Sequence, residues 1–185
     1  MGTRLLGAHQ ARNASFAAEL LGLLPDELRP TWGAIERGFE EVSWPGRLQV
    51  ANVRGTIWIL DVAHNPEGAR TLAASLSAMD LREPRILVVG ILADKDWREM
   101  LSHLVPGAAA TILTCPVSAP LSRMWDPKAA AAWCEEALGV VPRVIPDLGA
   151  ALMRASTLAP HGTIVVTGSI HTVGDAMREL GISAV

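Results

Sequence analysis

Short apolar runs alternate with segments of helical periodicity from residue 48 onward, and this alternation most constrains how the chain can fold. The runs at residues 57–60, 86–91 and 164–166 are rich in β-branched residues and almost continuously apolar. Strands that are apolar on both faces are typical of a parallel sheet covered by helices on each side. The pattern therefore predicts an α/β fold with a Rossmann-like, mostly parallel sheet and helices on both faces.

The expected elements follow from the places where the periodicity changes. Strands are predicted at residues 48–53, 56–62, 85–91, 110–115, 143–145 and 163–167. Helices are predicted between them, at residues 66–79, 97–104, 127–138, 148–158 and 173–180. The sequence shows no internal repeat and no low-complexity linker within this part.

The first part of the chain has a different, helical character. Apolar residues recur at i, i+3, i+4 and i+7 over residues 13–24, which predicts an amphipathic helix. Thr31 is a predicted N-cap for a second helix that continues to Val42. We therefore divide the chain into a helical segment, residues 1–43, and an α/β domain, residues 44–185.

Charge and hydropathy exclude several classes of function. The 185 residues are 50% hydrophobic and have a formal net charge of −3, and the 16 lysines and arginines form no cluster. Neither a nucleic acid nor a membrane surface is therefore an expected partner. No apolar run reaches the roughly 20 residues that a membrane span requires. Cys115 and Cys134 are predicted to be small apolar residues in a reducing compartment, so a cytoplasmic protein is expected.

Ligands of open parallel sheets bind outside the carboxyl ends of the strands, so residues that follow a strand are candidates for function. Asp61-Val-Ala-His-Asn-Pro66 joins an apolar strand to a helix. Asp61 can accept hydrogen bonds from a ribose diol, and His64 and Asn65 stand at a helix N-terminus, where free N–H groups favour anions. Taken alone, Asp61 is better interpreted as a loop carboxylate and Asn65 as a helix cap, but the complete string favours a nucleotide site.

Three further polar residues flank predicted strands. Arg47, in a Pro-Gly turn, is either a phosphate contact or a solvated arginine. Lys95 lies between two carboxylates and either pairs with a substrate carboxylate or forms a local salt bridge. Ser169 either presents its hydroxyl to a carboxylate or satisfies the free N–H groups at the N-terminus of the helix that follows it. The sequence contains no P-loop and no metal-binding or nucleophile motif, so no catalytic or metal-ligating residue is expected in the chain.

Several strings together resemble folylpolyglutamate synthases. That family has, in the same order and at the same spacing, Trp44-Pro-Gly-Arg-Leu-Gln49, Ile59-Leu-Asp-Val-Ala-His-Asn-Pro66, Gly90-Ile-Leu-Ala-Asp-Lys-Asp96 and Thr167-Gly-Ser169. The segment Gly7-Ala-His-Gln-Ala-Arg-Asn-Ala14 is similar to the end of the family's central ATPase domain. The resemblance covers essentially the whole chain, and the Mur ligases of cell-wall synthesis are broader relatives.

The resemblance implies an ATP-dependent amide ligase. In this family a carboxylate of dihydropteroate or folate is converted to an acyl phosphate, which the amine of L-glutamate attacks. ATP and Mg²⁺ are the implied cofactors, with most metal ligands in the N-terminal portion of such enzymes. Residues 1–43 would be a helical remnant of the central ATP-binding domain, and residues 44–185 the Mur ligase-type C-terminal glutamate-ligase domain.

The resemblance also implies roles for individual residues. Asp61 would hold the ribose and Arg47 the phosphates, within an ATP-binding set of Arg47, Asp61, His64, Gln10 and Asn13. The carboxylates of glutamate would be met by Lys95, Ser169 and Asn65. Gly174-Asp175 stands where the family often has a Gly-Glu pair, which keeps the charge and shortens its reach.

The implied enzyme is more than twice as long as this chain, because its P-loop, metal site and folate pocket lie in an N-terminal portion. The isolated chain is therefore expected to lack ligase activity and to bind ATP weakly. Two alternatives remain open, namely the C-terminal domain of a cell-wall Mur ligase and a non-catalytic nucleotide-binding module. The sequence does not distinguish synthesis of dihydrofolate from extension of polyglutamate tails.

Overall fold

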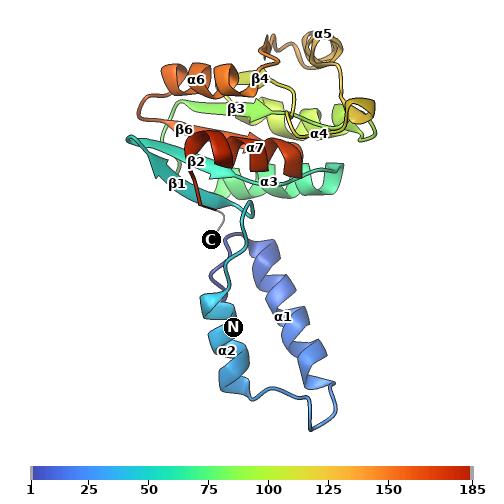
Figure 1. The fold of residues 1–185 in the computed structure, drawn as a ribbon, viewed down its shortest axis with the longest axis vertical. Helices are drawn as coiled ribbons and strands as arrows, with labels where there is room; N and C mark the ends of the chain where they lie inside the picture. The colour runs from blue at the N-terminus through green and yellow to red at the C-terminus, as the bar shows by residue number, and fades with distance from the viewer. Residues whose placement is uncertain (1, 184–185) are drawn as a thin grey trace.

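A computed structural model describes residues 2–183 of the chain (Figure 1). The helices are α1 (Ala8–Gly22), α2 (Trp32–Glu41), α3 (Pro66–Ala78), α4 (Trp97–Leu104), α5 (Pro127–Leu138), α6 (Leu148–Leu158) and α7 (Ile170–Leu180), with 3₁₀ turns η1 (Val105–Gly107) and η2 (Leu121–Arg123). The strands are β1 (Gln49–Val53), β2 (Thr56–Leu60), β3 (Arg85–Val89), β4 (Ala110–Leu113), β5 (Arg143–Val144) and β6 (Thr163–Thr167).

Every strand and helix predicted after residue 44 is present, and the differences lie at the ends. The bounds of α4, α5, α6 and β6 are those predicted. The strands β2, β3, β4 and β5 end one or two residues early, where the chain turns out of the ladder. Helix α7 begins at Ile170 rather than at Val173, because the Ser169 hydroxyl accepts a hydrogen bond from the Thr172 N–H and caps the helix earlier.

The sheet has the strand order β1-β2-β6-β3-β4-β5. β1 and β2 pair antiparallel, and all the other neighbours pair in parallel. Gln49 pairs with Leu60, so the residues before β1 lie beside the residues after β2. This register brings Arg47 and Asp61 to the carboxyl edge of the sheet.

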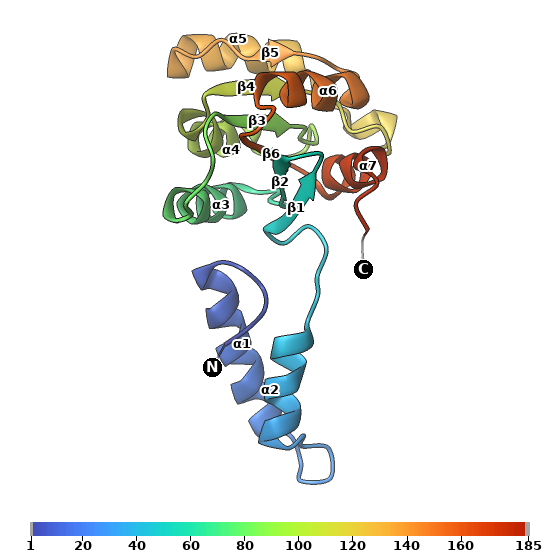
Figure 2. The same ribbon diagram turned by 90° about the vertical axis from the view of Figure 1, so that its left-hand side faces the viewer.

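Helices cover both faces of the sheet (Figure 2). Residues such as Ile59 and Leu87 face a core with α3, α4 and α5, and their strand neighbours Trp58 and Val88 face a core with α6 and α7. All five residues of β6 are buried, which explains why its sequence is apolar without alternation. The predicted fold class, a mostly parallel Rossmann-like sheet between helical layers, is confirmed.

The N-terminal segment forms a helical hairpin that projects away from the sheet (Figures 1 and 2). Helix α1 begins at Ala8, whereas the apolar spacing predicted a start at residue 13, because the first turn contains polar residues without apolar periodicity. The predicted cap of α2 is confirmed, since the Thr31 hydroxyl accepts a hydrogen bond of 3.3 Å from the Ala34 N–H. The hairpin meets the sheet domain through the N-terminal turn of α1.

Candidate functional site at the carboxyl edge of the sheet

Two adjoining cavities hollow the carboxyl edge beside β2. One, of about 180 Å³, is lined by His9, Arg47, Asp61, Ala63, His64, Asn65, Glu67, Gly68, Thr71 and Leu72. The other, of about 230 Å³, is lined by Leu5, His9, Gln10, Asn13, Trp44 and Arg47. Because His9 and Arg47 line both cavities, all the residues predicted for ATP binding border one region of the molecule.

Asp61 ties the start of β1 to the end of β2. Its side chain is buried, and its two oxygens accept hydrogen bonds of 2.9 Å from the Leu48 and Ala63 N–H groups. Leu48 has a φ of 45°, so this bond holds a turn that L-residues rarely adopt. Burial raises the pKa of Asp61, and the two N–H bonds and the charge of Arg47 oppose that rise. Each carboxylate oxygen accepts more than one bond, so Asp61 can hold the turn and still receive a hydroxyl.

His9 lies beside Asp61 and Arg47, and the sequence interpretation missed it. Its Nδ1 is buried and has no hydrogen-bond partner among the described residues. Burial lowers the pKa of His9, the charge of Asp61 opposes this, and the charges of Arg47 and Arg12 add to it. A Cβ on Gly7 (φ 102°) would lie 2.6 Å from the imidazole, so glycine permits this ring position. A buried nitrogen without a partner beside a cavity is a group that a bound ligand can satisfy.

His64 and Asn65 stand at the N-terminus of α3. The Asn65 Oδ1 accepts a hydrogen bond of 2.7 Å from the Gly68 N–H, so Asn65 is the helix cap that one interpretation predicted, and it also lines the cavity. The exposed His64 ring places Nδ1 3.0 Å from the Val62 carbonyl oxygen. The positive end of the α3 dipole thus borders the same cavity as the Arg47 guanidinium, and this combination favours a phosphate.

Lys95 lines neither cavity. Its Nζ lies 3.4 Å from an Asp94 oxygen, and Asp94 also accepts hydrogen bonds of 3.0 and 2.9 Å from Arg123. The Arg123 guanidinium lowers the pKa of Asp94 to about 2. Because β6 separates β2 from β3, the loop after β3 is displaced from Asp61 by two strand spacings, about 10 Å. Lys95 thus forms a salt bridge with Asp94, which is one of the two alternatives that the sequence allowed.

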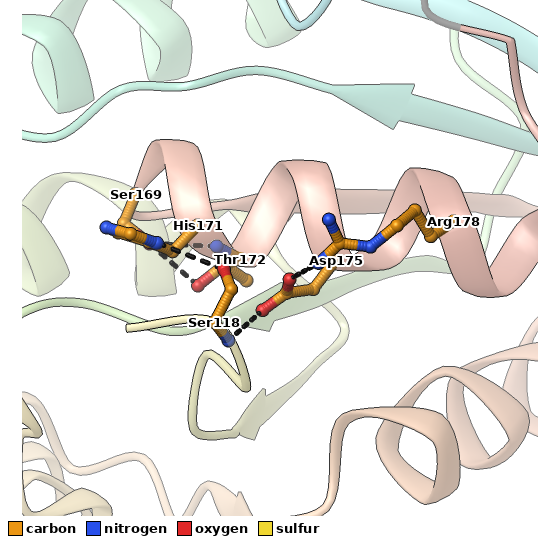
Figure 3. Close-up of polar contacts among 6 residues, drawn as sticks. All are labelled: Ser118, Ser169, His171, Thr172, Asp175 and Arg178. Atoms are coloured by element: carbon orange, nitrogen blue, oxygen red, sulfur yellow. Dashed lines mark hydrogen bonds and ion pairs between the residues drawn. The ribbon is translucent and has the colours of Figure 1, made fainter. Parts of the chain in front are cut away.

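Ser169 caps α7 and is almost closed to solvent (Figure 3). Its Oγ accepts a hydrogen bond of 3.0 Å from the Thr172 N–H and lies 2.9 Å from the Thr172 hydroxyl. The Thr172 hydroxyl donates to the Gly90 carbonyl at 2.7 Å, which joins the end of β3 to α7. A Cβ on Gly90 would lie 2.6 Å from that hydroxyl oxygen, so this approach requires glycine.

A second set of contacts joins α7 to the loop after β4 (Figure 3). The buried carboxylate of Asp175 accepts a hydrogen bond of 2.8 Å from the Ser118 N–H and pairs with Arg178. The Ser118 hydroxyl lies 3.0 Å from Nδ1 of His171. Asp175 therefore fixes this loop against α7. The sequence drew attention to Asp175 but contained no signal for Ser118, which lies in a loop without periodicity.

Two further properties bear on the class of protein. Within residues 2–183, no group of three or more histidine, cysteine, aspartate or glutamate side chains is placed to hold a metal ion. The same residues include no helix that is long and apolar enough to cross a membrane.

The α/β topology is accompanied by a match to a known family. A family model described as Mur ligase, glutamate ligase domain, matches residues 46–170. The chain therefore belongs to the Mur ligase family of glutamate ligase domains.

The relatives within that family are folate enzymes. A probable bifunctional folylpolyglutamate synthase/dihydropteroate synthase of Haloferax volcanii is 35% identical over 93% of this chain and 20% of that protein. A crystal structure of Mycobacterium tuberculosis folylpolyglutamate synthase complexed with ADP and AMPPCP matches with a TM-score of 0.79 and 30% identity, over 97% of this chain and 41% of that one.

Another solved structure, a bifunctional folylpolyglutamate synthase/dihydrofolate synthase with Mn, AMPPNP and L-glutamate bound, has a TM-score of 0.77 and 29% identity. The match covers 98% of this chain and 42% of that one. This chain thus spans less than half the length of these relatives. The resemblance to folylpolyglutamate synthases that the sequence strings indicated is confirmed.

Proposed function

We propose that this chain supplies the C-terminal part of an ATP-dependent ligase that adds L-glutamate to dihydropteroate or folate. The observation that carries the proposal is the grouping of Arg47, Asp61 and His9 around the N-terminus of α3. The buried Nδ1 of His9 has no hydrogen-bond partner among the described residues. A guanidinium, a helix N-terminus and a buried hydrogen-bonding carboxylate are suited to the phosphates and ribose of a nucleotide. Relatives solved with ADP, AMPPCP or AMPPNP support the same ligand class.

The proposed reaction has two steps. A carboxylate oxygen of the folate or dihydropteroate attacks the γ-phosphorus of ATP, and ADP leaves as the acyl phosphate forms. The amine of glutamate then attacks the acyl carbon, phosphate leaves, and the amine loses a proton as the amide forms. In this scheme Arg47 and the α3 N–H groups stabilise phosphate charge, and Asp61 and His9 orient the nucleoside.

Of the proposed glutamate contacts, Lys95 and Ser169 lie further along the same edge, whereas Asn65 lines the nucleotide cavity. Arg123 makes two short hydrogen bonds to Asp94, whereas Lys95 makes one longer contact, so the Lys95 ammonium remains available to a substrate carboxylate. The Ser169 hydroxyl and the Asn65 amide oxygen already cap helices. We therefore assign the N–H groups that these caps organise, rather than the side chains alone, to anion binding at the two helix termini.

The hairpin takes part in the same proposal. Gln10 and Asn13 of α1 border the second cavity, so residues 1–43 would approach the nucleotide from the side of the central ATP-binding domain. The P-loop, the folate pocket and the Mg²⁺ ligands are assigned to the portion of the relatives that this chain does not match. The 185-residue chain alone is therefore expected to show no turnover.

A chimera tests the proposal. The 185-residue chain replaces the matching segment of the Mycobacterium tuberculosis enzyme, and ATP-dependent incorporation of labelled glutamate into dihydropteroate and folate is measured. The chimera should be active, and Arg47→Ala should lower kcat/KM by about tenfold or more, because a charge-assisted phosphate contact is lost. Arg54→Ala, which changes an exposed arginine in the β1–β2 turn, is the matched control and should be nearly neutral.

A folded chimera without turnover, or equal activity in Arg47→Ala and Arg54→Ala, would contradict the proposal. The cell-wall alternative predicts glutamate or another amino acid on a muramyl peptide instead of a folate. Because the acceptor pocket is assigned to the unmatched portion, a second chimera, in which this chain replaces the matching segment of a cell-wall Mur ligase, is assayed with a muramyl peptide to separate the two. A non-catalytic module would leave the chimera able to bind ATP without ligation. The folate enzymes among the relatives favour the proposed folate ligase over both alternatives.

A further inference from the structure

The amino edge of the sheet contains a separate cavity, remote from the edge that carries Arg47 and Asp61. Its volume is about 290 Å³, and it is lined by Ala73, Leu76, Ser77, Arg85, Leu87, His103, Leu104, Pro106, Gly107, Ala108 and Val165. These residues come from the C-terminal halves of α3 and α4, from η1 and the residue after it, from the first and middle residues of β3, and from the middle of β6. Both helices begin at the carboxyl edge, so their ends define the opposite side of the domain.

Arg85 is the charged group of this cavity and is poorly satisfied. Its Nε is buried without a hydrogen-bond partner, and its Nη1 makes one long hydrogen bond of 3.4 Å to the Leu76 carbonyl. No ion pair involves Arg85 within residues 2–183. The nearby Glu83 carboxylate accepts from the Arg85 backbone N–H, at 2.8 Å, rather than from the guanidinium. A guanidinium has five N–H donors, so most of them lack a partner among the residues that the structure describes.

The remaining walls define what else a ligand would meet. Leu76, Leu87, Leu104 and Val165 supply apolar surface. The His103 ring and the Ser77 hydroxyl add polar groups at the rim, and the Ser77 hydroxyl donates to the Ala73 carbonyl at 3.0 Å. A Cβ on Gly107 would lie 3.8 Å from Nη2 of Arg85 and meet nothing closer, so the space in front of the guanidinium is open on that side.

We propose that this amino-edge cavity binds a small organic carboxylate with a compact apolar body. The guanidinium fork pairs with both oxygens of a carboxylate, and that pairing would satisfy the buried Nε. The leucine and valine walls would cover the apolar part of the ligand. One guanidinium balances one negative charge, which favours a carboxylate over a doubly charged phosphate. The site takes a ligand other than ATP and glutamate, at the opposite end of the strands.

Benzoate is the probe for this site. It is titrated into the ¹⁵N-labelled 185-residue chain, and the amide signals of Ser77, Arg85 and Gly107 are followed by NMR. The expected result is saturable shifts of these signals by benzoate, with binding of benzamide and of inorganic phosphate weaker by about tenfold or more. Benzamide lacks the charge and phosphate lacks the apolar body, so the two controls test the two halves of the proposed chemistry.

Four variants locate the binding. Arg85→Met should weaken benzoate binding by about tenfold or more. Arg82→Met, which changes an exposed arginine in the loop before β3, should leave it unchanged. Gly107→Leu keeps the guanidinium and fills the cavity, so it should also weaken binding. It provides an independent test if Arg85→Met unfolds, which a thermal melt would show. Arg47→Ala should have no effect, which separates this site from the proposed nucleotide site.

The inference is overturned if benzoate causes no saturable shifts in the folded chain. It is equally overturned if benzamide binds as well as benzoate, or if both Gly107→Leu and a folded Arg85→Met bind benzoate like the unmodified chain. Benzoate-induced shifts that gather at the carboxyl edge instead of the amino edge would overturn it as well.

Discussion

The sheet domain and the helical hairpin bury their apolar residues to very different degrees. In the sheet domain, Ile59, Val88 and Leu101 are fully buried between the sheet and its helices. In the hairpin, Leu20 is 62% exposed and Leu23 is 80% exposed. The sheet domain is therefore stabilised by its own core, whereas the hairpin presents an apolar surface that residues 2–183 do not cover.

The proposed nucleotide site, in contrast, needs both regions. Arg47 and Asp61 come from the sheet domain, and His9 and Gln10 come from the first turn of α1. Gln10 is buried, like Ala14 and Ala18 of the same helix, and it lines the second cavity. Part of the buried face of the hairpin therefore belongs to the proposed nucleotide site.

The largest expected difference between the regions is in unfolding free energy. Leu101→Ala in α4 should destabilise the chain by about 2–5 kcal/mol, because it leaves a cavity in the core. Leu20→Ala in α1 makes the same chemical change on an exposed helix face and should cost less than about 0.5 kcal/mol. Urea unfolding of both variants measures the pair, and equal losses would show that the hairpin is buried in solution.

The second expected difference concerns polar groups that hold a turn or a helix end. Asp61→Ala leaves the buried Leu48 and Ala63 N–H groups without their acceptor and should cost about 1–3 kcal/mol. Thr31→Ala removes the exposed cap of α2 and should cost about 1 kcal/mol or less. Asp61→Asn keeps one acceptor oxygen and should therefore cost less than Asp61→Ala. An unchanged urea unfolding midpoint for Asp61→Ala would show that the carboxylate does not hold the turn at Leu48.

The smallest expected effect is a pH dependence of stability that arises from His9, where the N-terminal turn of α1 meets the sheet domain. Burial lowers the pKa of His9 below its ordinary 6.5. Between the lowered pKa and 6.5 the unfolded chain binds a proton that the folded chain does not, so stability is full above pH 6.5 and falls as the pH is lowered through that window. His9→Gln should reduce this fall, and His161→Gln, at an exposed site, should not. Urea unfolding curves on both sides of pH 6.5 measure this fall in unfolding free energy. The same pH dependence in His9→Gln and in the unmodified chain would contradict the burial of His9.

The fold was largely predictable because strand and helix boundaries have local causes. Asp96, Asp126 and Asp147 each cap the helix that follows, and the predicted starts of those helices are correct. The antiparallel pairing of β1 was not visible in its own composition. Its consequence, the placement of Arg47 beside Asp61, depends on the register of the β1–β2 pair.

The candidate site was only partly predictable because it depends on strand order. The insertion of β6 between β2 and β3 separates Lys95 from Asp61, although both follow parallel strands. The sequence interpretation missed His9 because only the tertiary structure brings its imidazole close to Asp61. The backbone conformation at Gly7, with a positive φ, allows that position of the ring. Residue type and spacing identified the carboxyl edge, and only packing showed which residues share a cavity there.

Titration of the ¹⁵N-labelled chain with ATP tests the central claim most directly, because that claim places phosphates between Arg47 and the N-terminus of α3. We predict weak, saturable shifts of the Ala63, Asn65 and Gly68 amide signals, which Arg47→Ala abolishes while Arg54→Ala preserves them. Shifts that gather elsewhere, or that survive Arg47→Ala unchanged, would contradict the claim.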